Sequence, residues 1–424
     1  MKKILLVCVI FLCIVAHIPN KECFASTNAL EFCYENMTFY YDTSENLRTD
    51  NIFYSHTLKS RQIKEKYSNR ELLLKLTQAN IPKDISLYYI FPGLNKTIER
   101  IEKYLYIEER DADMKIVSNS KEVFQYLPER IGRRLDKSRL IDDIYRHVVL
   151  EDVSPIEIYS INIEPNKHLD EFKSYTHLRA DFSTDISSSS AERKHNIKNA
   201  LASINKTILG PNDIFSFNGA VGRRTAENGY RTAKIIVNNE FVEGLGGGVC
   251  QVSTTLYNSA LLSGLEILEA NKHSRPISYV KTGLDAMVNF GSSDLRFMNN
   301  TNNKIIIIAT YSSNKIRIRI YGEDLLNTKY SLSNEILEKY PANETIKYDT
   351  NKEYLDKIIY DDEFFYEKKA SDGMKVNSYR HKYQSGKLVD TELLRTDVYK
   401  PIDAIKVYGT KPRPTIVDIS DKCS

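Results

Sequence analysis

Four of the chain's 17 glycines lie within the five positions from Gly244 to Gly248, just before Cys250. Glycine has no Cβ, so a glycine-rich run lets the backbone turn sharply and lets other groups approach it closely. The small and apolar residues from Gln251 to Ser263 predict a helix, which Gly264 ends. The pattern therefore predicts a tight turn that places Cys250 at the start of a helix.

A cysteine at a helix start is a candidate nucleophile. The thiolate is the reactive form of cysteine, and the partial positive charge of a helix N-terminus favours it. The backbone amides of Gly247, Gly248 and the residues up to Cys250 are placed to hold the oxyanion of an acyl-transfer intermediate. The alternative is a buried structural cysteine in a strand-to-helix turn, since such cysteines are common. The turn alone leaves both interpretations open.

A cysteine nucleophile needs a base, and His273 follows Cys250 by 23 residues. The strand-like segment 276–280 comes next, and a helix followed by a returning strand brings the imidazole back towards the thiol. Asp285 is a candidate to accept a hydrogen bond from the second ring nitrogen and so orient the base. The sequence leaves these alternatives open: His177 or His195 as the base, and Asp294 as the orienting group.

The sequence has none of the usual patterns for a metal or a cofactor. It lacks paired cysteines, a His-Glu-x-x-His motif and clustered carboxylates, and its glycines are not followed by Gly-Lys-Ser/Thr. Basic and acidic residues number 59 and 56, a net charge of +3, which favours neither nucleic acid nor an anionic membrane as a partner. We therefore expect chemistry that relies on side chains alone.

The first 25 residues resemble a secretory signal peptide. Lys2 and Lys3 precede an apolar run from Ile4 to Ile18, and small residues lead to a cleavage site between Ala25 and Ser26. The run is shorter than the about 20 residues that span a bilayer, so we expect cleavage. The alternative is an uncleaved anchor, which would make the membrane a partner. In either case the rest of the chain is expected outside the cytoplasmic membrane.

Three of the six cysteines remain after this cleavage, namely Cys33, Cys250 and Cys423. An odd number in an exported protein leaves at least one free thiol or one bond between chains. The sequence does not decide whether Cys33 and Cys423 pair.

A chain of 424 residues is expected to form two or three domains, because one domain usually takes about 100–200 residues. Mixed helical and strand periodicity predicts an α+β, multidomain fold. We expect a tether at 26–62, an α+β domain at 63–165 and a central domain at 176–323. A polar linker at 324–350 and a small antiparallel β module at 351–412 follow.

Short motifs run through residues 176–323 in a fixed order. They are Phe215–Asn218, Val221–Ala226, Gly229-Tyr230, Gly246–Asn258, His273-Ser274, Tyr279, Gly283-x-Asp285-Ala286 and Asp294-Leu295-x-Phe297. In this order they resemble the VanW family. One departure is Asn271-Lys272, where the family often has Arg or another His.

The VanW resemblance implies a peptidoglycan L,D-transpeptidase of the cell envelope that needs no cofactor. Cys250 would be the nucleophile, with His273 as the base, Asp285 as its partner and peptidoglycan stem peptides as substrates. The residues expected to shape the substrate site are Gly247, Gly248, Gln251, Ser253, Thr254 and Tyr257. Helix packing explains some of the last four equally well. Two rivals remain, a non-catalytic peptidoglycan-binding protein of the wall and an amidase or endopeptidase.

Two flanking segments resemble other wall-associated modules. Glu109–Asp113, with the later Gly132 and Asp136, resembles the peptidoglycan-binding module often found before VanW domains. Tyr399–Asp403 and Val407–Lys411 resemble the end of a G5 domain, an extracellular β module associated with wall glycans. No nucleophile-base pair stands out beyond residue 350. We therefore expect the C-terminal module to hold the protein on the wall without taking part in the chemistry.

Overall fold

The computed structural model describes residues 29–43, 67–117, 122–237 and 240–414. These residues form two compact units, one from 29–112 and 128–167, the other from 113–127 and 168–414. The expected signal peptide and Cys423 lie outside the described residues. Within the described ranges, no helix is long and apolar enough to cross a membrane.

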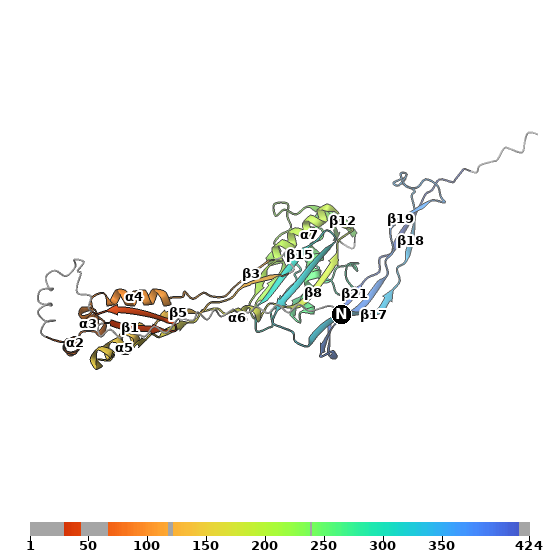
Figure 1. Ribbon diagram of the computed structural model, residues 1–424. Coiled ribbons are helices and arrows are strands. Elements are labelled where there is room, and N and C mark those ends of the chain that lie inside the picture. Colours follow the sequence, from red (N-terminus) through yellow and green to blue (C-terminus); the bar gives the residue numbers. More distant parts are fainter. Residues whose placement is uncertain (1–28, 44–66, 118–121, 238–239, 415–424) are drawn as a thin grey trace, which may run out of the picture. The chain divides into compact units, whose positions relative to one another are not determined.

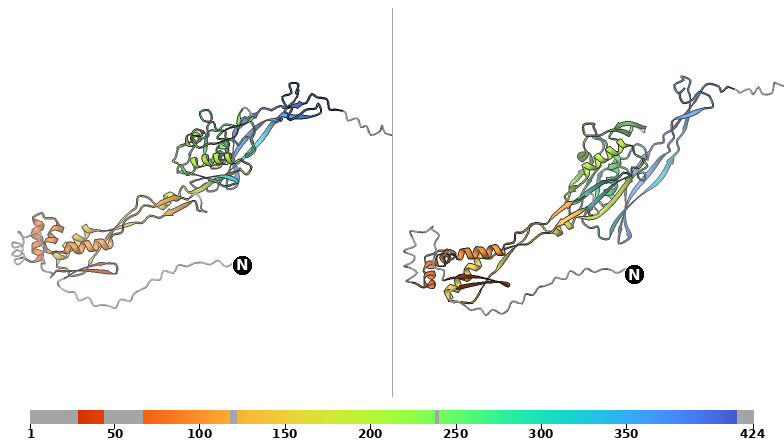
Figure 2. Two further views of the ribbon diagram at one scale, coloured as in Figure 1. Left: turned by 90° about the horizontal axis from the view of Figure 1, so that it is seen from above. Right: turned by 45° about the horizontal axis from the view of Figure 1, so that its top comes forward.

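The first unit is built from helices packed on small sheets (Figure 2). Its hairpin of β1 (Ala29–Tyr34) and β2 (Met37–Asp42) pairs with β6 (Ile156–Glu157), and Phe32 of β1 is fully buried in the core. The tether expected at 26–62 is therefore wrong for residues 29–42. The remaining elements are α2 (Asn69–Gln78), α3 (Lys83–Ile90), α4 (Leu94–Leu105), α5 (Lys137–Leu150), β5 (Gly132–Leu135) and β7 (Ser160–Ile163).

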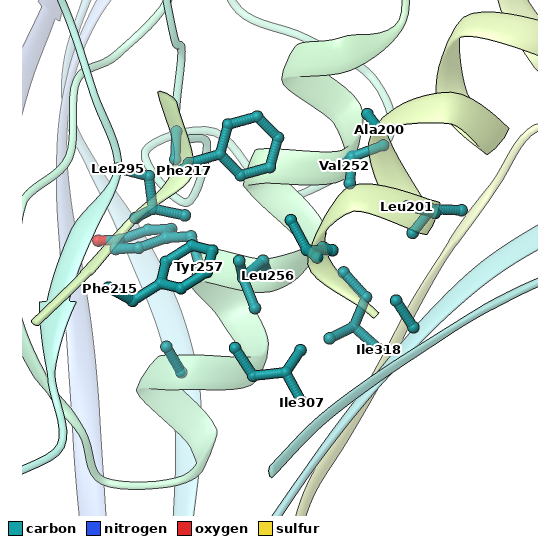
Figure 3. Packing of buried hydrophobic residues seen from close by; sticks show 14 of the residues in the cluster. Ala200, Leu201, Phe215, Phe217, Val252, Leu256, Tyr257, Leu295, Ile307 and Ile318 are labelled. Atoms are coloured by element: carbon teal, nitrogen blue, oxygen red, sulfur yellow. The ribbon is translucent and has the colours of Figure 1, made fainter. Parts of the chain in front are cut away.

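The second unit is centred on an antiparallel sheet in the order β8-β16-β15-β9 (Figure 1). These strands span β8 (His177–Asp185), β9 (Thr207–Leu209), β15 (Ile305–Tyr311) and β16 (Lys315–Gly322). The helices α7 (Ala191–Ile204) and α9 (Val249–Leu262) share an apolar core with this sheet. Figure 3 shows part of that core, with Leu256 and Tyr257 of α9 among Phe215, Leu295 and Ile318.

The other face of the sheet is partly covered as well. β3 (Asp113–Ile116) and β4 (Phe124–Leu127) form a hairpin whose Phe124 packs edge-on against Tyr321 of β16. Residues 113–127 thus pack with the central domain, which corrects the expectation that 63–165 forms one domain. The short element α6 (Leu169–Lys173) adds Phe172 to the same cluster.

Smaller elements of this unit contact the helices α7 and α9. A three-stranded sheet has the order β10-β14-β13, with β10 (Ile214–Ser216), β13 (Glu266–Glu269) and β14 (Arg296–Met298). The short helix α8 (Phe217–Val221) follows β10, and β11 (Thr232–Val237) pairs antiparallel with β12 (Glu240–Leu245) in a separate hairpin. Residues 276–280, expected as a strand, form an irregular, bent segment.

Two three-stranded sheets form the C-terminal part of this unit. In the first, β20 (Gly373–Gln384) lies between β17 (Thr328–Tyr340) and β21 (Lys387–Tyr399), and all pairs are antiparallel. In the second, β22 (Ala404–Tyr408) pairs antiparallel with β19 (Phe364–Lys368) and parallel with β18 (Glu344–Tyr348). The expected linker at 324–350 is therefore mostly strand, and the β module is not wholly antiparallel. The α+β class itself is confirmed.

Candidate active site

The glycine turn joins β12 to α9. Gly248 caps α9 at φ 105, a left-handed conformation that side chains disfavour, and an added Cβ would lie 2.9 Å from Cγ1 of Ile197 on α7. A Cβ on Gly247 would lie 2.7 Å from the Lys234 carbonyl oxygen of β11. These two glycines therefore let the start of α9 pack closely against its neighbours, a role that the sequence alone did not separate from substrate approach.

Cys250 is the second residue of α9, and its thiol is free and partly buried. Its Sγ lies 3.4 Å from the Val288 carbonyl oxygen, to which the thiol form donates a hydrogen bond. Burial opposes ionisation, but the hydrogen bond and charge of His273, with a smaller effect from the Arg224 cation, lower the pKa of Cys250 below its ordinary value. The site therefore favours the reactive thiolate.

His273 lies beside Cys250 and is only 6% exposed. Its Nδ1 donates to Oδ2 of Asp285 over 2.6 Å, and its backbone amide donates to the same oxygen over 2.7 Å. Nε2 is left to face the thiol. Burial opposes protonation, yet the hydrogen bonds to Asp285 and Cys250 raise the pKa of His273 to about 9. The structure thus brings the three expected catalytic residues together.

The alternative residues lie elsewhere in this unit. His195 on α7 contacts the Gly229 carbonyl oxygen, and exposed His177 begins β8. Asp294 accepts hydrogen bonds from the Ser216 hydroxyl and the Asn218 amide at the start of α8. Among the described residues, none of these three side chains forms a hydrogen bond with Cys250 or His273.

Asp285 is 1% exposed and accepts hydrogen bonds from both sides of the candidate site. Opposite His273, Nη2 of Arg395 lies 2.9 Å from Oδ1, and the Tyr399 hydroxyl lies 3.3 Å from the same oxygen. Burial opposes its charge, but the His273 hydrogen bond and the Arg395 cation hold the pKa of Asp285 below its ordinary value. Arg395 and Tyr399 belong to β21, where the sequence predicted no functional residue.

Two of the predicted substrate residues, Ser253 and Thr254, are fully buried and hold α9 against the segment that contains Asp285. The Ser253 hydroxyl donates to the Ala286 carbonyl oxygen over 2.6 Å. The Thr254 hydroxyl accepts from the Ala286 amide over 3.0 Å. These hydrogen bonds lie within the domain and position α9, and contact of the two side chains with substrate stays a prediction.

The other two, Gln251 and Tyr257, are also buried. Gln251 accepts from Nη2 of Arg193 over 3.0 Å and donates to the Asp185 carbonyl oxygen over 2.8 Å, which ties α9 to α7 and β8. Tyr257 packs in the core (Figure 3), where burial raises its pKa to about 12. Both side chains are thus held by contacts within the domain, and their part in a substrate site stays a prediction.

Arg224 lies close enough to Cys250 to stabilise its thiolate, although no role was predicted for it. Its Nη1 donates to Oδ1 of Asn218 over 2.7 Å and to the Gly222 carbonyl oxygen over 2.9 Å. Arg224 belongs to the motif Val221–Ala226, and this membership was the only feature of the sequence that pointed to a role for it. Arg224 and Arg395 thus supply positive charge on the two sides of the site.

The arrangement is that of a nucleophile, a base and an orienting carboxylate, which suits acyl transfer or hydrolysis. In the described residues, no group of three His, Cys, Asp or Glu side chains is placed to hold a metal ion.

Comparisons with known proteins agree with the sequence motifs. Residues 192–321 match the family described as VanW like protein, and residues 338–411 match the G5 domain. The uncharacterized protein YoaR of Bacillus subtilis (strain 168) is 36% identical over 204 residues, which are 48% of this chain and 67% of YoaR.

Other relatives are more distant. The vancomycin B-type resistance protein VanW of Enterococcus faecalis (strain ATCC 700802 / V583) is 26% identical over 144 residues, 33% of this chain and 52% of that protein. The chain thus spans about half the length of this relative. A solved G5 domain of an IgA1 protease is 19% identical and matches 20% of this chain and 93% of its own, with a TM-score of 0.14.

The VanW and G5 matches together indicate a cell-wall associated, extracytoplasmic protein. The VanW match contains Cys250, His273 and Asp285, and the similarity to YoaR extends over two thirds of that protein. The chain therefore belongs to the VanW family and has a G5 domain after its VanW domain.

Proposed function

We propose that the protein is a peptidoglycan L,D-transpeptidase in which Cys250 forms cross-links between the third residues of two stem peptides. The observation that carries this proposal is the hydrogen-bonded series Cys250–His273–Asp285, in which the thiol pKa is lowered and the imidazole pKa is raised. A thiolate beside a protonated imidazole is the resting state that covalent acyl transfer by cysteine requires.

In the first step, Sγ of Cys250 attacks the carbonyl carbon of the third residue of a tetrapeptide stem. The C–N bond to the terminal D-alanine breaks, and the His273 imidazolium gives its Nε2 proton to the departing amine. The products are free D-alanine, a thioester on Cys250 and a neutral His273. Asp285 keeps the imidazole oriented through both proton transfers.

In the second step, a side-chain amine of a neighbouring stem attacks the thioester carbonyl. Neutral His273 takes a proton from this amine, the C–S bond breaks, and a new amide joins the two third residues. The thiolate and imidazolium return to their starting state. No oxidant, reductant or added water is consumed.

The oxyanion of each tetrahedral intermediate needs hydrogen-bond donors next to Cys250. In the glycine turn, the Val249 amide donates to the Gly246 carbonyl oxygen and the Gln251 amide to that of Gly248. We assign the oxyanion to the remaining amides between Gly247 and Cys250, at the positive end of α9.

Two other functions predict different products. If water resolves the thioester, the enzyme is an amidase or endopeptidase that yields shortened stems. If no thioester forms, the protein binds peptidoglycan without catalysis, a reading that the G5 match favours. In all three cases we propose that stem peptides and glycan strands are the partners, and that residues 63–165, apart from the hairpin at 113–127, help to bind peptidoglycan.

Incubation of the purified protein with a disaccharide-tetrapeptide, followed by mass spectrometry, separates the three functions. Transpeptidation gives a dimer with the mass of two substrates minus one D-alanine. Hydrolysis gives a shortened monomer, and simple binding leaves the substrate mass unchanged. Cys33→Ala is the matched control, because it removes the other free thiol in the described residues without touching the VanW domain. A dimer formed equally by Cys250→Ala would disprove the proposal.

A further inference from the structure

The Cys250–His273–Asp285 series continues into a strand outside the VanW match. Arg395 lies on β21, within the G5 match at 338–411 and beyond the VanW match at 192–321. Its Nη2 donates to both the side chain and the backbone carbonyl oxygen of Asp285, over 2.9 and 2.7 Å. A guanidinium that holds both groups fixes the position of the carboxylate as well as its charge.

Arg395 is itself held by its neighbours. Its Nε donates to Oδ2 of Asp397 over 2.8 Å, and its guanidinium carbon lies 5.8 Å from the centre of the Tyr257 ring on α9. Its side chain is 15% exposed, so little water competes for these contacts. Cys250, His273, Asp285, Arg395 and Asp397 form a line of groups whose charges alternate in sign.

All three strands of the β17-β20-β21 sheet contact the segment that contains Asp285. Asn334 of β17 donates to the Thr282 carbonyl oxygen over 2.9 Å. Gly283 lies against β20, where an added Cβ would be 3.4 Å from the Ser378 side chain. Tyr399 of β21, 1% exposed, donates to Asp285. The sheet therefore packs directly against the segment that orients the base.

We infer that the active site is assembled from two domains, with Arg395 and Tyr399 of the G5 segment acting as positioning residues for Asp285 and, through it, for His273. This inference rests on the proposed role of Cys250 as the nucleophile. It makes thiol reactivity depend on docking of the G5 strands against the VanW domain. It also replaces the expectation that residues beyond 350 take no part in the chemistry.

The physical reason is the charge on Asp285. Without Arg395, a buried carboxylate loses its only cationic partner besides His273 among the described residues, and its protonation becomes easier. A protonated Asp285 no longer stabilises the imidazolium, so the thiolate is lost at a higher pH than in the parent. Among the described residues, the ionisable groups that face this cluster come from several elements: Cys250 and Tyr257 from α9, Arg193 from α7, Arg224, Lys272 and Tyr279 from the surrounding loops, Arg380 from β20, and Arg395, Asp397 and Tyr399 from β21.

The test measures the rate at which iodoacetamide alkylates Cys250 across pH, in the full chain with Cys33→Ala as background. Mass spectrometry of the peptide that contains Cys250 separates its alkylation from that of Cys423. We expect Arg395→Ala to move the acid limb of this profile to higher pH and to lower turnover about 10–100-fold, a loss of the size seen when the outer hydrogen-bond partner of a functional residue is removed at metal sites. Arg395→Lys, which keeps the charge but not the paired contact, should restore part of the shift. Tyr399→Phe should cause a smaller shift in the same direction.

Arg380→Ala is the matched control. Arg380 lies on the neighbouring strand β20 and donates to the Leu265 carbonyl oxygen over 2.8 Å, so it joins the same domains without touching Asp285. It should leave the alkylation profile at its parental position. Circular dichroism confirms folding, and Arg395→Lys and Tyr399→Phe decide the question if Arg395→Ala does not fold.

A folded Arg395→Ala protein with the parental alkylation profile and turnover would overturn the inference while leaving the proposed function intact. If Arg395→Ala shifts the alkylation profile but the parent protein never cross-links stems, the result would support two-domain assembly and reject transpeptidation. Alkylation needs no peptidoglycan, so the two failures are distinguishable.

Discussion

The Arg395 guanidinium lies 2.9 Å from the Asp285 carboxylate, although 110 positions of the chain separate the two residues. The contact joins a strand of the G5 match to the residue that orients His273. Because both partners are buried, the ion pair is shielded from the screening that weakens surface pairs. The variants below test the parts of the site that this contact supports.

Cys250→Ala should abolish cross-link formation and leave the fold intact. The substitution removes one sulfur atom at a partly buried position, so the expected loss of stability is small, about 1 kcal/mol. Cross-linking is measured by mass spectrometry and stability by thermal unfolding. Cys250→Ser is the sterner test, because a hydroxyl has a far higher pKa than a thiol and should be almost inert here. Activity retained in the serine variant would indicate that Cys250 is structural.

His273→Ala should lower the rate of cross-linking about 10²–10⁴-fold, the usual contribution of a general acid-base residue. It should also raise the pKa of Cys250, since the hydrogen bond and charge that favour the thiolate disappear. Kinetics measure the rate of cross-linking, and thiol alkylation over a range of pH measures the pKa of Cys250. Unchanged alkylation and rate would exclude His273 as the base.

The pH dependence of stability should reveal the protonation of His273. Its pKa is raised from 6.5 to about 9, so the protonated form stabilises the folded state below the unfolded pKa, and this contribution disappears as pH rises through about 9. The difference in free energy of unfolding between the parent and His273→Asn should therefore shrink from about pH 7 to about pH 10. Denaturant titrations at several pH values measure it. A difference that grows with pH would show that the neutral imidazole is the preferred form.

Ser253→Ala tests whether this residue positions α9 or contacts substrate. The Ser253 hydroxyl donates to the Ala286 carbonyl oxygen, so its loss should cost about 1–3 kcal/mol of stability by leaving a buried acceptor less well satisfied. We expect KM for the tetrapeptide to stay near the parental value. A large rise in KM with unchanged stability would return Ser253 to the substrate site.

The sequence predicted Cys250, His273 and Asp285 because each lies in a motif within one domain, and a helix followed by a returning segment brings them together. It missed Arg395 for a physical reason. Arg395 lies in β21, where alternating polar residues are typical of any half-exposed strand, and its contact with Asp285 depends on how two domains dock. A local sequence pattern does not predict how two domains dock.

The incorrect predictions of the fold have similar causes. Residues 324–350 were expected to be a linker because they are polar, yet β17 gains its stability by pairing with β20, which follows later in the chain. Residues 29–42 were expected to be a tether, but the hairpin buries Phe32 against helices formed much later in the sequence. In each case tertiary packing decided the structure and local composition did not.

Gly248→Ala should destabilise the protein, and Gly291→Ala supplies the control that explains why. Both glycines have positive φ, 105 and 88, but a Cβ at Gly248 would lie 2.9 Å from Ile197 whereas one at Gly291 would meet nothing within 4 Å. Backbone strain costs about 1–2 kcal/mol at either site, and overpacking adds about 1–3 kcal/mol at Gly248 alone. Thermal unfolding should therefore rank the parent above Gly291→Ala and Gly291→Ala above Gly248→Ala. Because the turn also places Cys250, alkylation of the thiol should slow in Gly248→Ala only. Equal losses in both variants would mean that α9 can move away from α7, and the close packing assigned to the turn would be wrong.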